Sequence, residues 1–202
     1  MLADFVPALP VLAAYTLASI ILGITPGPDM TFFLSKTVAQ SRAAGLAAFG
    51  GASTGLVIHS VLIAAGLSVL LAASVTAFTI LKIVGALYLA YLAVDAIRNG
   101  SALSLDKRGR SERLGAVYLK GLLVNILNPK IIVFFVTFLP QFVSPTDPEA
   151  AKKLLFLGLF FAVVNTPICV GLILFADRIA GLLRRSPRIT RAIDWAFATV
   201  LG

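Results

Sequence analysis

The feature that most constrains this chain is a helix-breaking run inside a long apolar stretch. Pro26-Gly27-Pro28-Asp29 interrupts the apolar residues between Pro10 and Leu34, and Asn128-Pro129-Lys130 interrupts another apolar stretch in the second half of the sequence. Proline lacks the amide N–H that a helix needs, and lipid cannot pair the backbone groups that are left free. Breaks at membrane depth are tolerated where the backbone faces protein or a water-filled cavity. One break in each half of a chain therefore points to the binding site of a transporter.

The composition supports a membrane location. The 202 residues are 59% hydrophobic and only 13% charged, with a mean hydropathy of +0.98, whereas soluble domains are about a quarter charged. The net charge of +8 does not form one patch, because the basic residues fall in loops between apolar segments. That placement is typical of membrane orientation and argues against a nucleic-acid partner.

Two single residues limit the chemistry. Cys169 is the one cysteine and lies in an apolar run, so we interpret it as a small buried hydrophobe and expect no intrachain disulfide. His59 is the one histidine and has no Cys or His at metal-ligand spacing, so neither a metal site nor a cofactor is expected. Few carboxylates lie within the apolar segments, which makes an enzyme's catalytic constellation improbable. The N-terminus lacks a basic n-region, so we expect the first apolar segment to be retained rather than cleaved as a signal peptide.

The pattern of apolar segments predicts an all-α integral membrane protein. A helix needs about 20 apolar residues to cross the hydrocarbon core. Six hydrophobic segments are expected at about residues 5–24, 44–72, 75–97, 116–139, 154–176 and 189–202. They form a single transmembrane domain over residues 1–202, with halves of about 1–98 and 114–202 and a polar linker at 99–113. Residues 190–202 reach only about 20 Å as a helix, so we expect the sixth helix to be truncated.

The two halves are predicted to be inverted repeats. Three segments in each half make the second half enter the membrane in the opposite sense. A shift of 102 residues aligns Ile24 with Ile126 and Phe32-Phe33 with Phe134-Phe135, and it places Pro26 on Asn128. Together with the matching breaks, these identities favour two inverted three-helix repeats.

Lysine and arginine predict the orientation. Lys36 and Arg42 follow the first segment, and Lys152 and Lys153 stand alone on the opposite side. The connections after the third and fifth segments hold most of the other basic residues: Arg98, Lys107, Arg108, Arg110, Arg113, Lys120, Arg178, Arg184, Arg185, Arg188 and Arg191. Cytoplasmic loops carry the excess of Lys and Arg, so the N-terminus is predicted to be extracytoplasmic.

Asp29 and Lys130 are the first candidates for substrate or proton contacts. A carboxylate in or near the bilayer usually faces a cavity, a partner or a headgroup. Asp29 is therefore expected to contact an ammonium group or to carry a proton, and the alternative is an interfacial N-cap that opens a helix at Met30. Lys130 follows the second break. It could pair with Asp29, hold the carboxylate of a zwitterion whose ammonium is at Asp29, or merely snorkel to the membrane surface.

The asparagines near the breaks are further candidates. Asn125 and Asn128 are three residues apart and are expected on one helical face, where their amides could satisfy freed backbone groups or contact substrate. Asn165, with Pro167, is read as a weaker third break within the fifth segment.

His59, Lys82 and Tyr88 are second-tier candidates. His59 shares a helical face with Gly51 and Gly55, a spacing that favours close helix packing. The imidazole could relay protons or be an inert hydrogen-bonded group. Lys82 could snorkel or counter Asp29, and Tyr88 could reach a cavity.

At these residues the chain resembles the LysE/RhtB family of bacterial amino-acid exporters. The matching stretches are Thr25-Pro-Gly-Pro-Asp-Met30, Arg42-Ala-Ala-Gly-Leu46 with the glycine-rich run to His59, Leu81-Lys-Ile-Val-Gly-Ala-Leu-Tyr-Leu-Ala-Tyr-Leu92, Lys120-Gly-Leu-Leu-Val-Asn-Ile-Leu-Asn-Pro-Lys130 and Phe138-Leu-Pro-Gln-Phe142. The resemblance implies six transmembrane segments in the bacterial cytoplasmic membrane and export of an amino acid or related metabolite, driven by proton antiport. The early end of the sixth helix departs from the family.

The function predicted from the sequence is the export of small zwitterionic solutes by alternating access. The expected partners are an amino acid, protons and the lipid bilayer, and a homo-oligomer stays open. The predicted site holds Pro26, Gly27, Pro28, Asp29, His59, Lys82, Tyr88, Asn125, Asn128, Pro129, Lys130 and Asn165, with no catalytic residue. A channel-like or non-transporting membrane protein of the same fold is the alternative.

Overall fold

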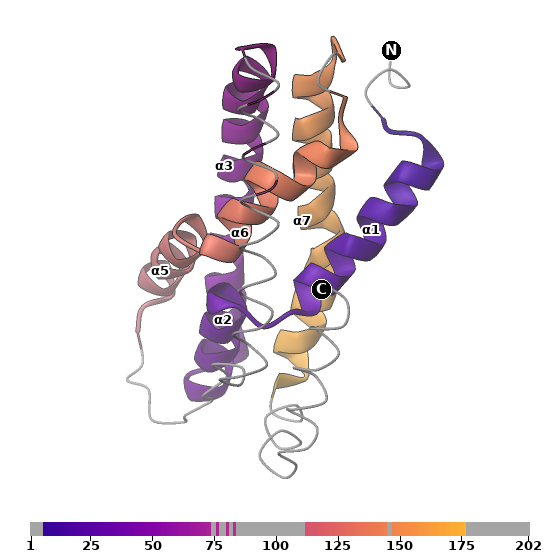
Figure 1. Cartoon of the computed structure of the whole chain (residues 1–202). Coiled ribbons are helices and arrows are strands. Elements are labelled where there is room, and N and C mark those ends of the chain that lie inside the picture. Colours follow the sequence, from indigo (N-terminus) through magenta and orange to yellow (C-terminus); the bar gives the residue numbers. More distant parts are fainter. Residues whose placement is uncertain are drawn as a thin grey trace.

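The computed structural model describes residues 6–73, 112–144 and 147–176, with isolated positions at 76, 80 and 83. Every regular element in these ranges is helical, as the sequence predicts (Figure 1). The elements are α1 (Leu9–Ile24), α2 (Pro28–Ala39), α3 (Arg42–Ala73), α5 (Leu114–Ile126), α6 (Pro129–Val133), the π-helix η1 (Phe134–Phe138), the 3-10 helix η2 (Leu139–Phe142) and α7 (Ala150–Leu174). The third and sixth predicted segments lie almost wholly outside the described residues.

The first break bends the chain between α1 and α2. The two helices meet at 51°. Gly27 is the N-cap of α2, and Pro28 takes the first helical position, where the missing N–H of proline costs nothing. Asp29 is therefore not the N-cap that the alternative interpretation required, and lies in the first turn of α2 instead. Helix α2 continues to Ala39, beyond the apolar residues that end at Leu34.

The second break repeats this geometry between α5 and α6. The bend is 48°, and Pro129 again takes the first helical position, after the N-cap Asn128. The side-chain oxygen of Asn128 accepts a hydrogen bond from the backbone N–H of Lys130 at 3.0 Å. Asn128 is thus placed after the end of α5, so the prediction that it shares a helical face with Asn125 is wrong.

The ends of these helices refine the predicted register. Ile24 and Ile126 end α1 and α5, in agreement with a shift of 102 residues. After the breaks the equivalent caps are Gly27 and Asn128, which corresponds to a shift of 101, so the pairing of Pro26 with Asn128 is wrong. The first break is one residue longer than the second, and a single shift cannot describe both sides of it.

Helices α3 and α7 are long and apolar, and they stand side by side in Figure 1. Residues Arg42–Gly66 of α3 and all of α7 can each span a membrane, and each bent pair can form one further span. The described residues therefore contain up to four membrane spans. Large apolar side chains on their outer faces are exposed, among them Leu17, Leu62 and Val163 at 61–67%, as expected for surfaces that face lipid.

Glycines let α3 pack closely against α5. A Cβ atom on Gly51 would overlap the carbonyl oxygen of Tyr118, and a Cβ atom on Gly121 would overlap the carbonyl oxygen of Ala48. The backbones of the two helices therefore touch at reciprocal points. The packing role predicted for Gly51 is confirmed.

Replacement of Gly51 by alanine is expected to destabilise the protein, whereas Gly66→Ala is the matched control. A Cβ on Gly66, in the same helix, meets no atom within 4 Å. Because the Gly51 methyl would push two helix backbones apart, we expect a loss of about 1–3 kcal/mol. The apparent melting temperature in detergent measures this difference. Equal melting temperatures for the two variants would contradict the close α3–α5 contact.

Helix α7 contradicts the predicted third break, because it passes through Pro167 as a continuous helix. Proline there removes the backbone donor to the carbonyl of Val163, four residues earlier. Nearby, Asn165 Nδ2 donates to the Phe161 carbonyl at 2.9 Å, and Thr166 Oγ1 donates to the Ala162 carbonyl at 2.7 Å. These polar side chains thus bond to their own helix, which continues through the proline.

The buried apolar residues form two clusters. One is centred on Tyr15, Phe134, Phe135 and Leu157, and the Tyr15 hydroxyl donates to the Leu157 carbonyl at 2.9 Å. The other cluster contains these residues: Met30, Phe33, Leu34, Ala48, Val117, Cys169, Ile173 and Ala176. The buried apolar core of the described residues is therefore divided into two clusters.

Candidate functional site

A cleft lies where the two helix breaks approach each other. This small cleft, with a volume of about 30 Å³ and partly open to the surroundings, is bordered by residues of α1, α2, α3, α5, α6 and α7. Leu56, Ile131 and Phe161 of the first apolar cluster and Met30, Phe33 and Cys169 of the second line its walls. The polar lining consists of Asp29, Asn125, Lys130 and Asn165. The cleft thus separates the two parts of the core.

Lys130 joins the second break to the first. Its side chain is buried, and Nζ donates to the carbonyl oxygens of Leu22 at 3.1 Å and Thr25 at 2.8 Å. Those carbonyls lie at the C-terminal end of α1, where a helix carries partial negative charge and unpaired acceptors. Lys130 therefore does not snorkel to the membrane surface. An ammonium has three N–H donors, so one remains for another partner.

Asp29 lies across Gly27 from Lys130 and does not form an ion pair with it. Its Oδ1 accepts from the backbone N–H of Met30 at 2.9 Å, and its Oδ2 accepts from Asn125 Nδ2 at 3.3 Å. A Cβ on Gly27 would lie 3.1 Å from Lys130 Nζ and 3.3 Å from Asp29 Oδ1. The absence of a side chain at Gly27 thus lets both charged groups border one small space.

Two asparagine–glycine contacts flank this space. The side-chain oxygen of Asn125 in α5 presses against Gly55 in α3, and the side-chain oxygen of Asn165 in α7 presses against Gly23 in α1. Neither oxygen has a hydrogen-bond partner, although both residues are more than nine-tenths buried. Gly23 and Asn125 are equivalent positions under the 102-residue shift, each directly before the isoleucine that ends its helix. One contact thus has its asparagine in α5 and its glycine in α3, and the other has its asparagine in α7 and its glycine in α1.

The other predicted site residues lie around the cleft or away from it. Gly27 and Asn128 cap α2 and α6, and Pro28 and Pro129 begin these helices. Pro26 lies within the first break. His59 is buried next to Phe135, with 5.6 Å between ring centroids, and does not line the cleft. Lys82 and Tyr88 lie outside the described residues.

Sequence reasoning missed the apolar walls of the cleft. Phe33, Phe49, Leu56 and Phe161 come from three helices, α2, α3 and α7, and each is an ordinary apolar residue in its own segment. No local pattern distinguishes them from core residues. Gly23 could have been found, because the 102-residue shift places it on Asn125.

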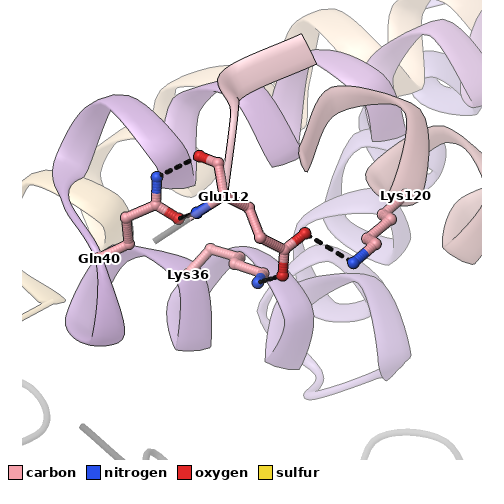
Figure 2. A network of polar contacts seen from close by, with 4 residues as sticks. All are labelled: Lys36, Gln40, Glu112 and Lys120. Carbon is pink, nitrogen blue, oxygen red and sulfur yellow. Dashed lines mark hydrogen bonds and ion pairs between the residues drawn. The ribbon is translucent and has the colours of Figure 1, made fainter. Parts of the chain in front are cut away.

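A second polar cluster lies where α2 ends and α5 begins, and Figure 2 shows its four residues. Glu112 contacts Lys36 at 2.7 Å and Lys120 at 2.6 Å. Gln40 Nε2 donates to the Glu112 carbonyl at 2.7 Å, and the Glu112 N–H donates to Gln40 Oε1 at 3.1 Å. The hydrogen bonds from Lys120 and Lys36 lower the pKa of Glu112 from 4.5 to about 2, so this carboxylate is ionised at physiological pH.

The beginning of α7 has its own ion pairs. Lys153 contacts Asp147, and Lys152 contacts Glu149 at 2.6 Å. The hydrogen bond from Lys153 lowers the pKa of Asp147 below its ordinary value. All four residues come from one short stretch of the chain. These pairs therefore stabilise the start of α7 rather than connecting distant elements.

The cleft suits an organic ligand that carries an ammonium group. It offers the Asp29 carboxylate, two amide oxygens without donors and one remaining Lys130 N–H, within walls of aromatic and aliphatic side chains. No group of three or more His, Cys, Asp or Glu side chains at metal-binding distance occurs among the described residues. The positive charge of Lys130 and the negative charge of Asp29 cancel, so a ligand of no net charge needs no further counter-ion.

The fold and the cleft define a helical membrane protein whose two broken helix pairs enclose a polar site. The chain belongs to the LysE type translocator family, whose sequence model matches residues 20–202. It is an all-α integral membrane protein of that family, as the sequence predicts.

Curated relatives agree with this assignment. The chain is 33% identical over 187 residues to the homoserine/homoserine lactone efflux protein of Salmonella typhimurium, covering 93% of this chain and 90% of the relative. It is 30% identical over 187 residues to a membrane protein of Vibrio cholerae, with the same coverage. It is 29% identical over 154 residues to the leucine efflux protein of Salmonella choleraesuis, covering 75% of this chain and 72% of the relative. No solved structure matches the chain.

Proposed function

We propose that this protein exports small amino acids or related zwitterionic metabolites from the cytoplasm. The observation that carries the proposal is the placement of Asp29 and Lys130, one from each helix break, on either side of Gly27 in one cleft. Asp29 contacts the ammonium of the substrate, and the remaining N–H of Lys130 contacts its carboxylate. Helix breaks that carry charged groups into a shared cavity are typical of transporter binding sites.

The names of the relatives support the ammonium as the constant part of the substrate. Homoserine, homoserine lactone and leucine share an amino group on the α-carbon, whereas the lactone has no free carboxylate and leucine has no hydroxyl. In this chain the acceptors outnumber the free donors in the cleft, since Asp29, Asn125 and Asn165 all offer oxygen atoms. Lys130, with one N–H left, can serve a carboxylate or a neutral carbonyl.

The proposed mechanism is alternating access coupled to protons. The matching bends of 51° and 48° support two inverted repeats that rock around the cleft. Asp29 is the proposed proton carrier, because it is the one carboxylate among the described residues that line the cleft. Protonation of Asp29 releases the ammonium, and its deprotonation permits the next one to bind.

We place the protein in the bacterial cytoplasmic membrane, with its N-terminus outside. The cluster of Lys36, Glu112 and Lys120 then lies at the cytoplasmic surface, as the excess of basic residues requires. Asp29 precedes Lys36 by two turns of α2, which corresponds to about 10 Å along the helix axis. Asp29 therefore lies below the membrane surface, at a depth that suits a substrate-binding site within the membrane.

Uptake into everted membrane vesicles tests the proposed function. Labelled homoserine and leucine, supplied with a proton gradient of either direction, should enter in a saturable manner and respond to the gradient. Non-saturable uptake would favour the channel-like alternative, and no uptake of any amino acid in a broad panel would contradict the proposal. Resistance of expressing cells to toxic amino-acid analogues identifies which side chains are accepted.

A further inference from the structure

The four-residue cluster around Glu112 connects distant parts of the chain at one end of the molecule. Lys36 and Gln40 come from the last turns of α2, and Glu112 and Lys120 come from the start of the second described range (Figure 2). Among the described residues, the other ion pairs join near neighbours at the start of α7. The Glu112 cluster is thus a long-range polar tie between the segments that follow and precede the two helix breaks.

The contacts within the cluster have separate roles. Lys120 belongs to α5, the helix that Glu112 precedes, so its ion pair with Glu112 stays within the second part of the chain. Lys36 and Gln40 then reach from α2, and Lys36 also lies over the ring of Phe32 at 5.7 Å. Gln40 binds both the N–H and the carbonyl of Glu112. Within the cluster, only the contacts of Lys36 and Gln40 connect α2 to the second part of the chain.

We propose that Lys36, Gln40 and Glu112 form a latch that holds the cytoplasmic end of the cleft closed and opens to admit substrate from the cytoplasm. The latch rests on the proposed function, because alternating access requires the cytoplasmic side to open. In this structure α2 lines the cleft with Asp29, Met30 and Phe33, and its far end is held by the latch. Movement of that end away from α5 widens the cleft towards the cytoplasm.

The strength of the latch suits a reversible contact. The Lys36 and Glu112 side chains are partly exposed, at 16% and 28%, and ion pairs that water can reach contribute little each. Water replaces these contacts readily when the latch opens. The lowered pKa of Glu112 keeps the carboxylate charged at pH 7, so opening does not depend on protonation of the latch.

The cysteine in the cleft permits a direct test. Cys169 is the only cysteine of the chain and lines the cleft. In everted vesicles, a membrane-impermeant maleimide reaches Cys169 from the cytoplasmic side only when the cleft is open. We expect Lys36→Met to raise the labelling rate roughly three-fold and the double variant Lys36→Met/Gln40→Ala to raise it roughly ten-fold. The readout requires no transported substrate, so it is independent of which amino acid is carried.

Matched variants separate the latch from a general loss of stability. Lys120→Met removes an ion pair from the same carboxylate but no tie to α2, and Glu149→Gln removes a pair at the start of α7. Both should label close to the wild-type rate, and Cys169→Ser should not label.

Wild-type labelling of the double variant, or an equal increase in Glu149→Gln, would overturn the proposal. So would an increase confined to right-side-out vesicles, because the cluster would then lie on the outer side. If labelling behaves as expected but vesicles take up no amino acid, the latch stands and the proposed substrate class fails.

Discussion

Asp29→Asn is expected to reduce transport at least ten-fold while leaving the protein folded in the membrane. The substitution removes the negative charge that attracts the ammonium of the substrate and, in our proposal, carries the coupling proton. It also places an amide where Asn125 Nδ2 now donates to a carboxylate oxygen. The size of the side chain hardly changes, so the helix bend at Gly27 is expected to persist. Initial rates of uptake into everted vesicles, normalised to the amount of protein, measure the effect.

Two comparisons make the Asp29 result interpretable. Glu149→Gln neutralises a carboxylate at the start of α7, outside the cleft, and should transport at the wild-type rate. Counterflow, the exchange of labelled for unlabelled substrate without a proton gradient, requires substrate binding but no net proton transport. If Asp29 binds the ammonium, counterflow should therefore be lost in Asp29→Asn. Wild-type net transport in Asp29→Asn would remove this residue from the mechanism.

Lys130→Met should impair both transport and stability, which distinguishes it from Asp29→Asn. Methionine fills a similar volume but donates no hydrogen bond, so the Thr25 carbonyl loses its donor, whereas the Leu22 carbonyl keeps the backbone N–H of Thr25 at 3.2 Å. A buried acceptor left unpaired costs about 1–3 kcal/mol. We expect a lower melting temperature in detergent and at least a ten-fold loss of uptake.

Lys130→Arg provides the conservative control. Arginine keeps the positive charge and several donors, but its planar guanidinium does not match the compact ammonium. The charge should largely preserve stability, whereas the altered geometry at Gly27 should still reduce transport. A melting temperature for Lys130→Met equal to that of the wild type would contradict the role of Lys130 in holding the end of α1.

The sequence predicts the helix breaks well because their causes are local. Pro28 and Pro129 fix where α2 and α6 begin, and the apolar runs predict the long helices α3 and α7. The prediction fails at Pro167, because α7 accommodates this proline within a continuous helix. The third break therefore does not occur. The π-helix at Phe134–Phe138 likewise has no breaker residue that would have revealed it.

The site is predictable only in part, since its contacts cross the whole sequence. The charge and the break together single out Asp29 and Lys130, and both line the cleft. That Lys130 binds the carbonyls at the end of α1 could not be known from a sequence, because those carbonyls are present in any helix of any composition. Glu112 lies in a polar linker whose sequence has no distinguishing pattern. Its role can be inferred only from Lys36 and Gln40, which are close in space but distant in the sequence.

The contacts of Asn125 with Gly55 and of Asn165 with Gly23 restrict how this sequence can diverge. A methyl group at Gly23 or Gly55 would occupy the position of an amide oxygen on the opposing helix, so a larger residue at either glycine requires its asparagine to turn away or to become smaller. In related sequences, a change at one partner of each contact is therefore expected to appear together with a change at the other.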